Sequence, residues 1–298
     1  MTALVLGVLA FVLAGPAPTL LSRVGWTAKV PRASVVLWQA MALAAVLAAL
    51  GAGVAVTLDT IDRPDPGLGW TVIHVAAFTL TVVVAIRLGW SAARVAMRTR
   101  RRRARHRMLV DLLSKQEYSS AELRVLDETT PLAYCLPGVR DPRVVLSEGT
   151  LEHLDQNELR AVLAHERAHL RARHDLVLEA FTMLREAFPL PTNRAPLEQS
   201  GRLVEMLADD AARKRVGPVA VARALVALAH APIPKAALGL SGTATVQRVQ
   251  RLAEPDNGHR LLAFGVYAVA AAIVVVPTLT VAVPLLSRIP DALALWWS

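Results

Sequence analysis

Long stretches without a charged side chain alternate along the chain with one long stretch that is rich in charge. Four stretches contain no Asp, Glu, Lys or Arg: residues 1–22, 33–58, 66–86 and 261–287. Each is at least as long as the ~20 apolar residues that a helix needs to cross a ~30 Å hydrocarbon core. We therefore predict four transmembrane helices, at about 1–22, 34–58, 66–87 and 261–287.

The apolar stretches divide the chain into three parts. Residues 1–95 hold three of the predicted transmembrane helices, residues 96–259 form a domain outside the membrane, and residues 260–298 hold the fourth helix and a short tail. The composition agrees, because 54% of the residues are hydrophobic and only 19% are charged, against about 25% charged in soluble proteins. This excludes a simple soluble globule.

The charges between the apolar stretches predict an orientation. The first connection carries only basic residues: Arg23, Lys29 and Arg32. The second is mainly acidic: Asp59, Asp62 and Asp65, with Arg63. A cluster of arginines follows the third stretch, from Arg94 to Arg107. Basic loops stay in the cytoplasm, so we predict a multi-pass protein of the cell membrane with a cytoplasmic central domain and external N- and C-termini.

Two alternative interpretations, a cleaved signal peptide and a nucleic-acid-binding segment, agree less well with the sequence. The first stretch resembles a cleaved signal peptide, but its positive charges follow the apolar run instead of preceding it. The arginine cluster and the net charge of +9 also suit nucleic acid, yet no base-reading motif accompanies them. Arginines at the end of a span usually bind anionic lipid. We therefore expect the bilayer as a partner and no direct nucleic acid binding.

The central domain has patterns of both strands and helices, which predicts an α+β fold. A helix begins near residue 108, and three short apolar runs predict strands near Leu123–Leu126, Leu132–Leu136 and Val144–Ser147. Asp155 and Glu158 have the spacing of a capping box, so a helix should run from about Gln156 to Ala172. The pattern predicts four further helices: Leu176–Ala187, Leu197–Arg215, Val219–His230 and Thr243–Leu252.

The capped helix carries the pattern H-E-x-x-H as His165, Glu166 and His169. Residues four apart share a helix face, so both imidazoles can bind one zinc ion at ~2.0–2.1 Å. Glu166 then lies where it can take a proton from a water molecule and return it to a leaving amine. A charged helix can also spell this pattern by chance, which leaves a purely structural role open.

A second predicted helix argues against a purely structural role for the H-E-x-x-H segment. It carries Glu205 and, four residues later, Asp209, the spacing of a metal ligand and of an acid that supports a histidine ligand. Glu179 and Glu186 also follow His169 on a helix, but we predict Glu205 as the third ligand.

Several segments together resemble membrane metallopeptidases of the BlaR/MecR antirepressor type, of which the HtpX-type proteases are relatives. The segments are Ala161-Val-Leu-Ala-His-Glu-Arg-Ala-His-Leu, Ala133-Tyr-Cys-Leu-Pro-Gly, Val144-Val-Leu-Ser-Glu-Gly and Glu205-Met-Leu-Ala-Asp-Asp. The resemblance implies a zincin-like (gluzincin) domain and one Zn²⁺ per chain. It also implies His165, His169 and Glu205 as ligands, Glu166 as general base and Asp209 as the supporting acid.

The resemblance further implies a protein substrate, a cytoplasmic winged-helix repressor of the BlaI type in a signalling pathway. We expect an extended substrate segment to pair with the strand of Leu132, Ala133, Tyr134, Cys135 and Leu136. Only residues 288–298 follow the fourth stretch in this sequence, so we expect no external penicillin-binding sensor. The alternatives are a quality-control protease of the HtpX type and a non-proteolytic membrane receptor or scaffold.

Three other residues have ordinary interpretations. His174 and Asp175 follow the zinc helix among Arg171 and Arg173. Assistance to the metal site is one alternative for them, but we predict an exposed helix end. Cys135 is the only cysteine, so it cannot form an intramolecular disulfide, and we predict that it is a small core residue.

Overall fold

The computed structural model describes residues 2–61, 67–115, 122–138, 141–229, 242–254 and 258–297. Asp62, Arg63 and Asp65 of the second connection, together with His230 and Ser298, therefore lie outside the described residues. The chain forms two compact units. Unit 1 contains residues 1–92, 183–196 and 259–298, and unit 2 contains residues 93–182 and 197–258.

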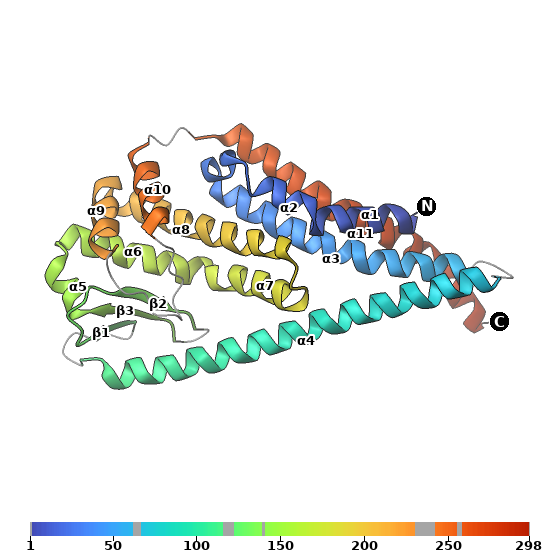
Figure 1. The fold of residues 1–298 in the computed structure, drawn as a ribbon, viewed down its shortest axis with the longest axis horizontal. Coiled ribbons are helices and arrows are strands. Elements are labelled where there is room, and N and C mark those ends of the chain that lie inside the picture. The colour runs from blue at the N-terminus through green and yellow to red at the C-terminus, as the bar shows by residue number, and fades with distance from the viewer. Residues whose placement is uncertain are drawn as a thin grey trace. The chain divides into compact units, whose positions relative to one another are not determined.

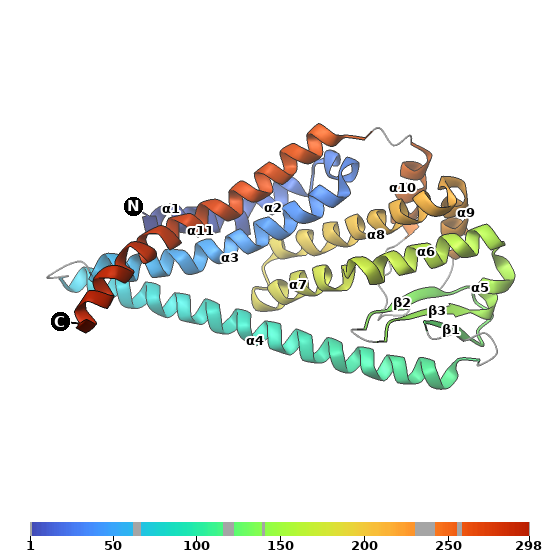
Figure 2. The same cartoon turned by 180° about the vertical axis from the view of Figure 1, so that it is seen from behind.

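Unit 1 consists of long apolar helices (Figure 1). The elements are α1 (Thr2–Ala14), α2 (Pro16–Leu21), a 3-10 helix η1 (Gly25–Lys29), α3 (Pro31–Ile61), the start of α4 (Leu68–Leu113) and α11 (Arg260–Trp297). Helix α3 packs against both α1 and α11, which run beside it in both views (Figures 1 and 2). Among the described residues, four helical segments are long and apolar enough to cross a membrane: Thr2–Leu21, Pro31–Asp59, Leu68–Leu113 and Arg260–Val283.

The helices of unit 1 differ in two details from the predicted spans. The first span, predicted as one helix over 1–22, is broken between α1 and α2. Pro16 has no N–H to continue the helix and Gly15 lowers its stability. Helix α11 continues past residue 287 to Trp297, so the segment predicted as a tail is helical.

Helix α4 is a single helix of 46 residues, whereas the sequence pattern divides it at residue 95 and begins a new helix near 108. At 1.5 Å per residue it is ~69 Å long, more than twice the hydrocarbon thickness. Arginine is a good helix former and no Gly or Pro follows Gly89 in this segment, so nothing ends the helix where the apolar residues end. The helix is therefore too long to lie wholly within a hydrocarbon core.

Residues 183–196 form the tip of a helical hairpin and cluster with unit 1, although they lie inside the range predicted for the catalytic domain. Helix α7 (His174–Ala187) ends here and α8 (Arg194–Val216) begins, with a 3-10 turn η3 (Pro191–Asn193) between them. Arg87 of α4 donates to the Ala187 carbonyl at 2.9 Å and Ser91 donates to the Met183 carbonyl at 2.7 Å. The bond to Ala187 satisfies a carbonyl that the end of α7 leaves unpaired.

Unit 2 contains a three-stranded sheet with strand order β1-β3-β2. The strands are β1 (Leu123–Leu126), β2 (Ala133–Leu136) and β3 (Arg143–Ser147), close to the predicted ranges. Strand β3 pairs in parallel with β1 and antiparallel with β2. Strand β2 is therefore an edge of the described sheet. Its Tyr134 and Leu136 are buried with Val145 of β3 and Val110 of α4.

The helices of unit 2 agree with the predicted ones to within a few residues. They are α6 (Gln156–Ala172), the first part of α7, most of α8, α9 (Pro218–Leu228) and α10 (Gly242–Ala253). The capping box is present, since the Asp155 side chain accepts from the N–H groups of Asn157 and Glu158 while Glu158 accepts from the Asp155 N–H. Helix α6 packs against β2 and β3, and also against α9. The capping box fixes the first residue of α6, and with it the face of the helix on which the H-E-x-x-H side chains lie.

One short helix was not predicted, α5 (Glu148–His153). Its cap is Ser147, whose hydroxyl accepts from the Thr150 N–H and donates to the Thr130 carbonyl. A Cβ at Gly149 would collide with the Thr129 backbone, so the glycine permits a close backbone approach. Because glycine has a low helix propensity, the sequence pattern around Gly149 did not predict a helix.

Candidate metal site

Helix α6 presents the two histidines of the H-E-x-x-H segment on one face. His165 Nε2 and His169 Nε2 lie 3.1 Å apart, as expected for residues one helical turn apart. His169 is buried, and the His165 side chain is 13% exposed. The two rings thus point toward the same small volume.

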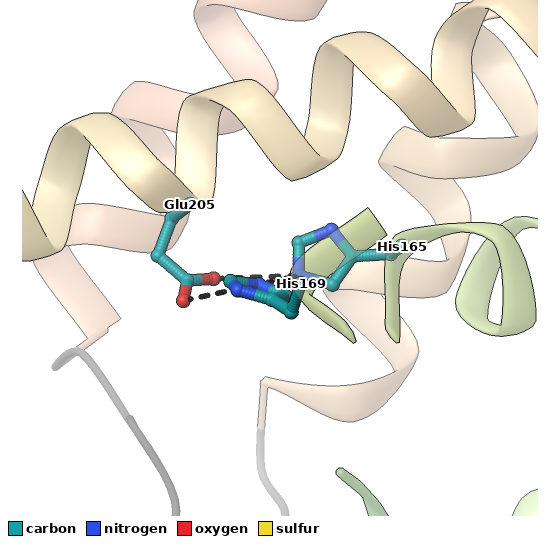
Figure 3. Close-up of side chains that lie close together, drawn as sticks. All are labelled: His165, His169 and Glu205. Atoms are coloured by element: carbon teal, nitrogen blue, oxygen red, sulfur yellow. Dashed lines mark hydrogen bonds and ion pairs between the residues drawn. The ribbon is translucent and has the colours of Figure 1, made fainter. Parts of the chain in front are cut away.

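Helix α8 brings Glu205 to the same place (Figure 3). Its Oε2 lies 3.4 Å from His165 Nε2, and its Oε1 lies 3.5 Å from His169 Nε2. Ligand atoms of the three residues all lie within 4.8 Å of one another, and this is the one such cluster among the described residues. Of the acids considered from the sequence, Glu179 instead pairs with Arg103 at 3.6 Å.

The outer nitrogen of each imidazole also lies close to another side chain. His165 Nδ1 lies 3.0 Å from Asp209 Oδ1, the contact expected for an acid that fixes the orientation of a histidine ligand. His169 Nδ1 lies 3.0 Å from His174 Nδ1. Asp209 is buried, 1% exposed.

The prediction of an exposed helix end at His174 and Asp175 is wrong. The two residues are only 5% and 7% exposed. Arg173 adopts a left-handed backbone conformation at the end of α6, and this corner turns the start of α7 inward. A single left-handed residue leaves little sequence signal when it is not glycine.

Arg248 of α10 is a site residue that sequence reasoning missed. It donates to both oxygens of Asp209, at 2.7 and 2.6 Å, and its Nη1 lies 3.1 Å from Glu205 Oε2. Arg251, one turn later, makes a second two-bond pair with Asp210 of α8. Arg248 and Arg251 are arginines among many in this sequence, so only the packing of α10 on α8 distinguishes them.

Burial and charge set the protonation of the cluster. Burial alone would raise the pKa of Glu205, but His165, His169 and Arg248 hold it at about 2. Burial alone would likewise raise the pKa of Asp209, and Arg248 and His165 hold it at about 2. Burial lowers the pKa of His169 to about 4, and burial also lowers that of His174 to about 4.

His165 has the opposite shift. Burial alone would lower its pKa, but Asp209 and Glu205 raise it to about 10. The two ionised carboxylates therefore favour a positive charge between the imidazoles and Glu205. A divalent cation would supply that charge.

The donor set fits zinc. Atoms bound to one tetrahedral zinc ion at ~2.0–2.1 Å lie ~3.3–3.4 Å from one another. The three separations given above are 3.1, 3.4 and 3.5 Å. Two imidazoles and one carboxylate are also the protein ligands of many catalytic zinc sites, which keep one position open.

Glu166 of α6 lies beside this cluster, on the side of the helix near Cys135 of strand β2. Burial raises the pKa of its carboxyl group, and the nearby positive charge of His165 opposes that shift. The Cys135 thiol of β2 lies near enough to Glu166 for each group to shift the pKa of the other. Burial raises the pKa of this thiol, so it stays protonated at neutral pH, which argues against a nucleophile.

The predicted substrate strand is present as β2 at the edge of the described sheet, with Leu132 just before it. Tyr134 and Leu136 point into the core, whereas Ala133 and Cys135 are only partly buried. The proximity of Cys135 to Glu166 places this edge next to the general base that we predict. Pairing with a substrate stays a prediction.

Comparison with known proteins supports a metallopeptidase. Residues 98–208 match the model of peptidase family M48, a range that includes His165, Glu166, His169 and Glu205. A protein described as "Protease HtpX homolog" from Methanopyrus kandleri is 38% identical over 76 residues, which are 24% of this chain and 24% of that protein. The chain thus matches about a quarter of the length of that relative. No solved structure matches the chain.

These matches, with the four apolar helices, support a membrane metallopeptidase related to the M48 family. They agree with the predicted relation to HtpX-type proteases. The BlaR/MecR type, the zincin-like fold and the cytoplasmic orientation stay predictions.

Proposed function

We propose that the protein is a membrane-embedded zinc-dependent endopeptidase. The observation that carries this proposal is the convergence of His165, His169 and Glu205 from α6 and α8, with Glu166 beside them. A structural zinc site is usually closed by four protein ligands. Three ligands and an adjacent carboxyl group suit catalysis better, which argues against the receptor or scaffold alternative.

His165, His169 and Glu205 would hold the metal. When bound, zinc supplies a Lewis acid that polarises the scissile carbonyl and makes the attacking water more acidic. Glu166 accepts the proton of that water and then donates it to the leaving nitrogen. Its raised pKa suits both roles, because a general base works best when its pKa approaches the operating pH. An extended substrate would pair with β2, at the edge of the described sheet.

The catalytic unit is cytoplasmic in this proposal, with both chain ends external. The support is the excess of Arg and Lys in the first connection and after the third apolar stretch, since such charges stay inside. The exposed arginines of α4 would contact anionic lipid at the membrane surface.

Cysteine labelling tests this orientation. In a Cys135→Ser background, Gly67→Cys should react with a membrane-impermeant maleimide in intact cells, and Glu152→Cys should react only after permeabilisation. Gly67 and Glu152 are both exposed, so the permeabilised sample shows that each thiol is reactive. Labelling of Glu152→Cys alone in intact cells would reverse the topology and exclude cytoplasmic substrates.

The proposed substrate is a cytoplasmic winged-helix repressor, cut in a segment that opens locally at low cost. The support is the resemblance of the motif segments to BlaR/MecR antirepressors. The second candidate is a quality-control protease that cleaves many damaged membrane proteins. The match to a protein described as an HtpX homologue favours it.

Comparing new protein N-termini in cells with wild type and with Glu166→Gln separates the two candidates. A repressor substrate predicts one discrete fragment that disappears in the Glu166→Gln strain, both in the cellular survey and when a candidate repressor is co-expressed. Many unrelated fragments, with an intact repressor under inducing conditions, would contradict the repressor and favour quality control.

A further inference from the structure

Each histidine of the candidate metal site has a side chain close to its outer nitrogen, and for His169 the two groups are hydrogen-bonded. Each directs Nε2 toward Glu205 and Nδ1 away from it. His165 Nδ1 faces Asp209 at 3.0 Å, and His169 Nδ1 faces His174 at 3.0 Å. A histidine that binds metal through Nε2 carries a proton on Nδ1 and needs an acceptor there. His174 is the residue that stands in this position for His169.

We propose that His174 is a positioning residue that accepts a hydrogen bond from His169 Nδ1 and fixes the orientation of that ligand, and that an ion pair between Arg103 and Asp175 holds His174 in place. The inference rests on the proposed zinc site. It assigns a role to a histidine outside H-E-x-x-H and to one arginine of the cluster that the sequence associates with lipid.

The chain geometry shows why His174 reaches His169. On an uninterrupted helix, a residue five positions later points ~140° away, since each residue turns the helix by ~100°. Here Arg173 interrupts α6 with φ 50° and ψ 44°, and among the described residues it is the one non-glycine position with positive φ. The corner folds His174 back, so that its ring meets the His169 ring edge-on at 4.9 Å between centroids.

A charge cluster fixes the start of α7 directly beside His174. Arg103 Nη1 lies 2.9 Å from Asp175 Oδ2, and Arg103 Nη2 lies 3.6 Å from Glu179 Oε2. The Asp175 side chain is 5% exposed and that of Arg103 is 23% exposed. Arg173 also contacts Asp175, at 3.2 Å. Removal of Arg103 would leave Asp175 buried without its closest positive charge, a costly state.

Arg103 differs from its neighbours in the arginine cluster. It lies on the inward face of α4, the face that also carries the buried Val95 and Val110. Arg101, Arg102 and Arg105 are exposed, as residues that contact lipid headgroups or water should be. Arg102 is therefore a matched control for Arg103, with the same side chain on the same helix.

Zinc affinity of the purified full chain in detergent tests the proposal, measured by competition with a chromophoric chelator. His174→Phe keeps a ring of similar size but cannot accept the bond, so zinc binding should weaken about 10- to 100-fold. His174→Asn should recover most of that loss, because its amide oxygen can accept from His169 Nδ1. Arg103→Met should also weaken zinc binding, whereas Arg102→Met should not.

Co²⁺ in place of zinc gives a second readout, because its visible absorption reports ligand geometry. The spectrum should change in His174→Phe and return toward wild type in His174→Asn, an effect that a general loss of stability would not produce. Wild-type affinity and spectrum in His174→Phe, or an Asn variant no better than Phe, would overturn the role of His174. Equal effects of Arg103→Met and Arg102→Met would overturn the role of the ion pair. A wild-type chain that binds no zinc would instead overturn the proposed function itself.

Discussion

Replacing Glu166 with Gln should abolish peptide cleavage while the chain still holds one zinc ion. Glutamine cannot accept a proton from the attacking water, and a positioned general base typically contributes 10²–10⁴-fold to the rate. The zinc ligands are His165, His169 and Glu205 in our proposal, so the metal content should not change. Cleavage of a protein substrate and zinc content by atomic absorption, measured on the same preparations, check both parts.

His165→Ala is the control for the Glu166 variant, because it should lose both the metal and the activity. Loss of zinc in Glu166→Gln would contradict the assignment of Glu166 as a base that does not hold the metal. Retained cleavage would contradict the reaction that we propose. The two failures are distinguishable, since one appears in the metal content and the other in the rate.

Glu205→Ala should weaken zinc binding by more than the roughly 10- to 100-fold that loss of a supporting residue costs. Glu205 supplies the oxygens that lie 3.4 and 3.5 Å from the two histidine nitrogens, so its removal leaves two ligands. Glu198→Ala is a matched control, because Glu198 is an exposed glutamate on the same helix α8. Chelator competition measures the affinity of each variant.

Glu186→Ala tests the alternative third ligand that the sequence left open. Glu186 is exposed near the end of α7, and it is not among the residues that converge with His165 and His169. Zinc affinity should therefore stay at the wild-type value. A variant at Glu186 that loses the metal, beside a Glu205 variant that keeps it, would refute the ligand assignment.

Local patterns predicted most of the elements. The capping box at Asp155 and Glu158 placed the start of α6 at Gln156, where the structure has it. The apolar stretches located the four candidate spans. Patterns failed where a helix runs through a change of composition, as in α4, or where glycine lies in a helix, as in α5. In α4 the helix preference of arginine continues the helix past the apolar residues, whereas in α5 the close backbone approach at Gly149 outweighs the low helix propensity of glycine.

The sequence also predicted which residues of α6 share a face, because helical periodicity alone brings His165 and His169 together. It favoured Glu205 and Asp209 through a four-residue spacing and a resemblance, and the structure brings both to the histidines. It placed His174 at an exposed helix end, which is wrong, and it gave no signal for Arg248. Helical spacing does not predict the contact of His174 with His169 across the corner at Arg173, or the contact of Arg248 of α10 with Asp209 of α8. Both contacts depend on tertiary packing.

The sequence by itself determined the apolar helices, the start of α6 and the pairing of two histidines on it, because each depends on the chemistry of residues within a few turns. The tertiary structure brings Glu205, which spacing and resemblance already favoured, to those histidines. It alone decided which arginine pairs with Asp209 and which histidine lies beside His169 Nδ1. These choices bring together α4, α6, α7, α8 and α10. The chain contains many acidic, histidine and arginine residues, and only those that the fold buries around His165 and His169 can act at the candidate metal site.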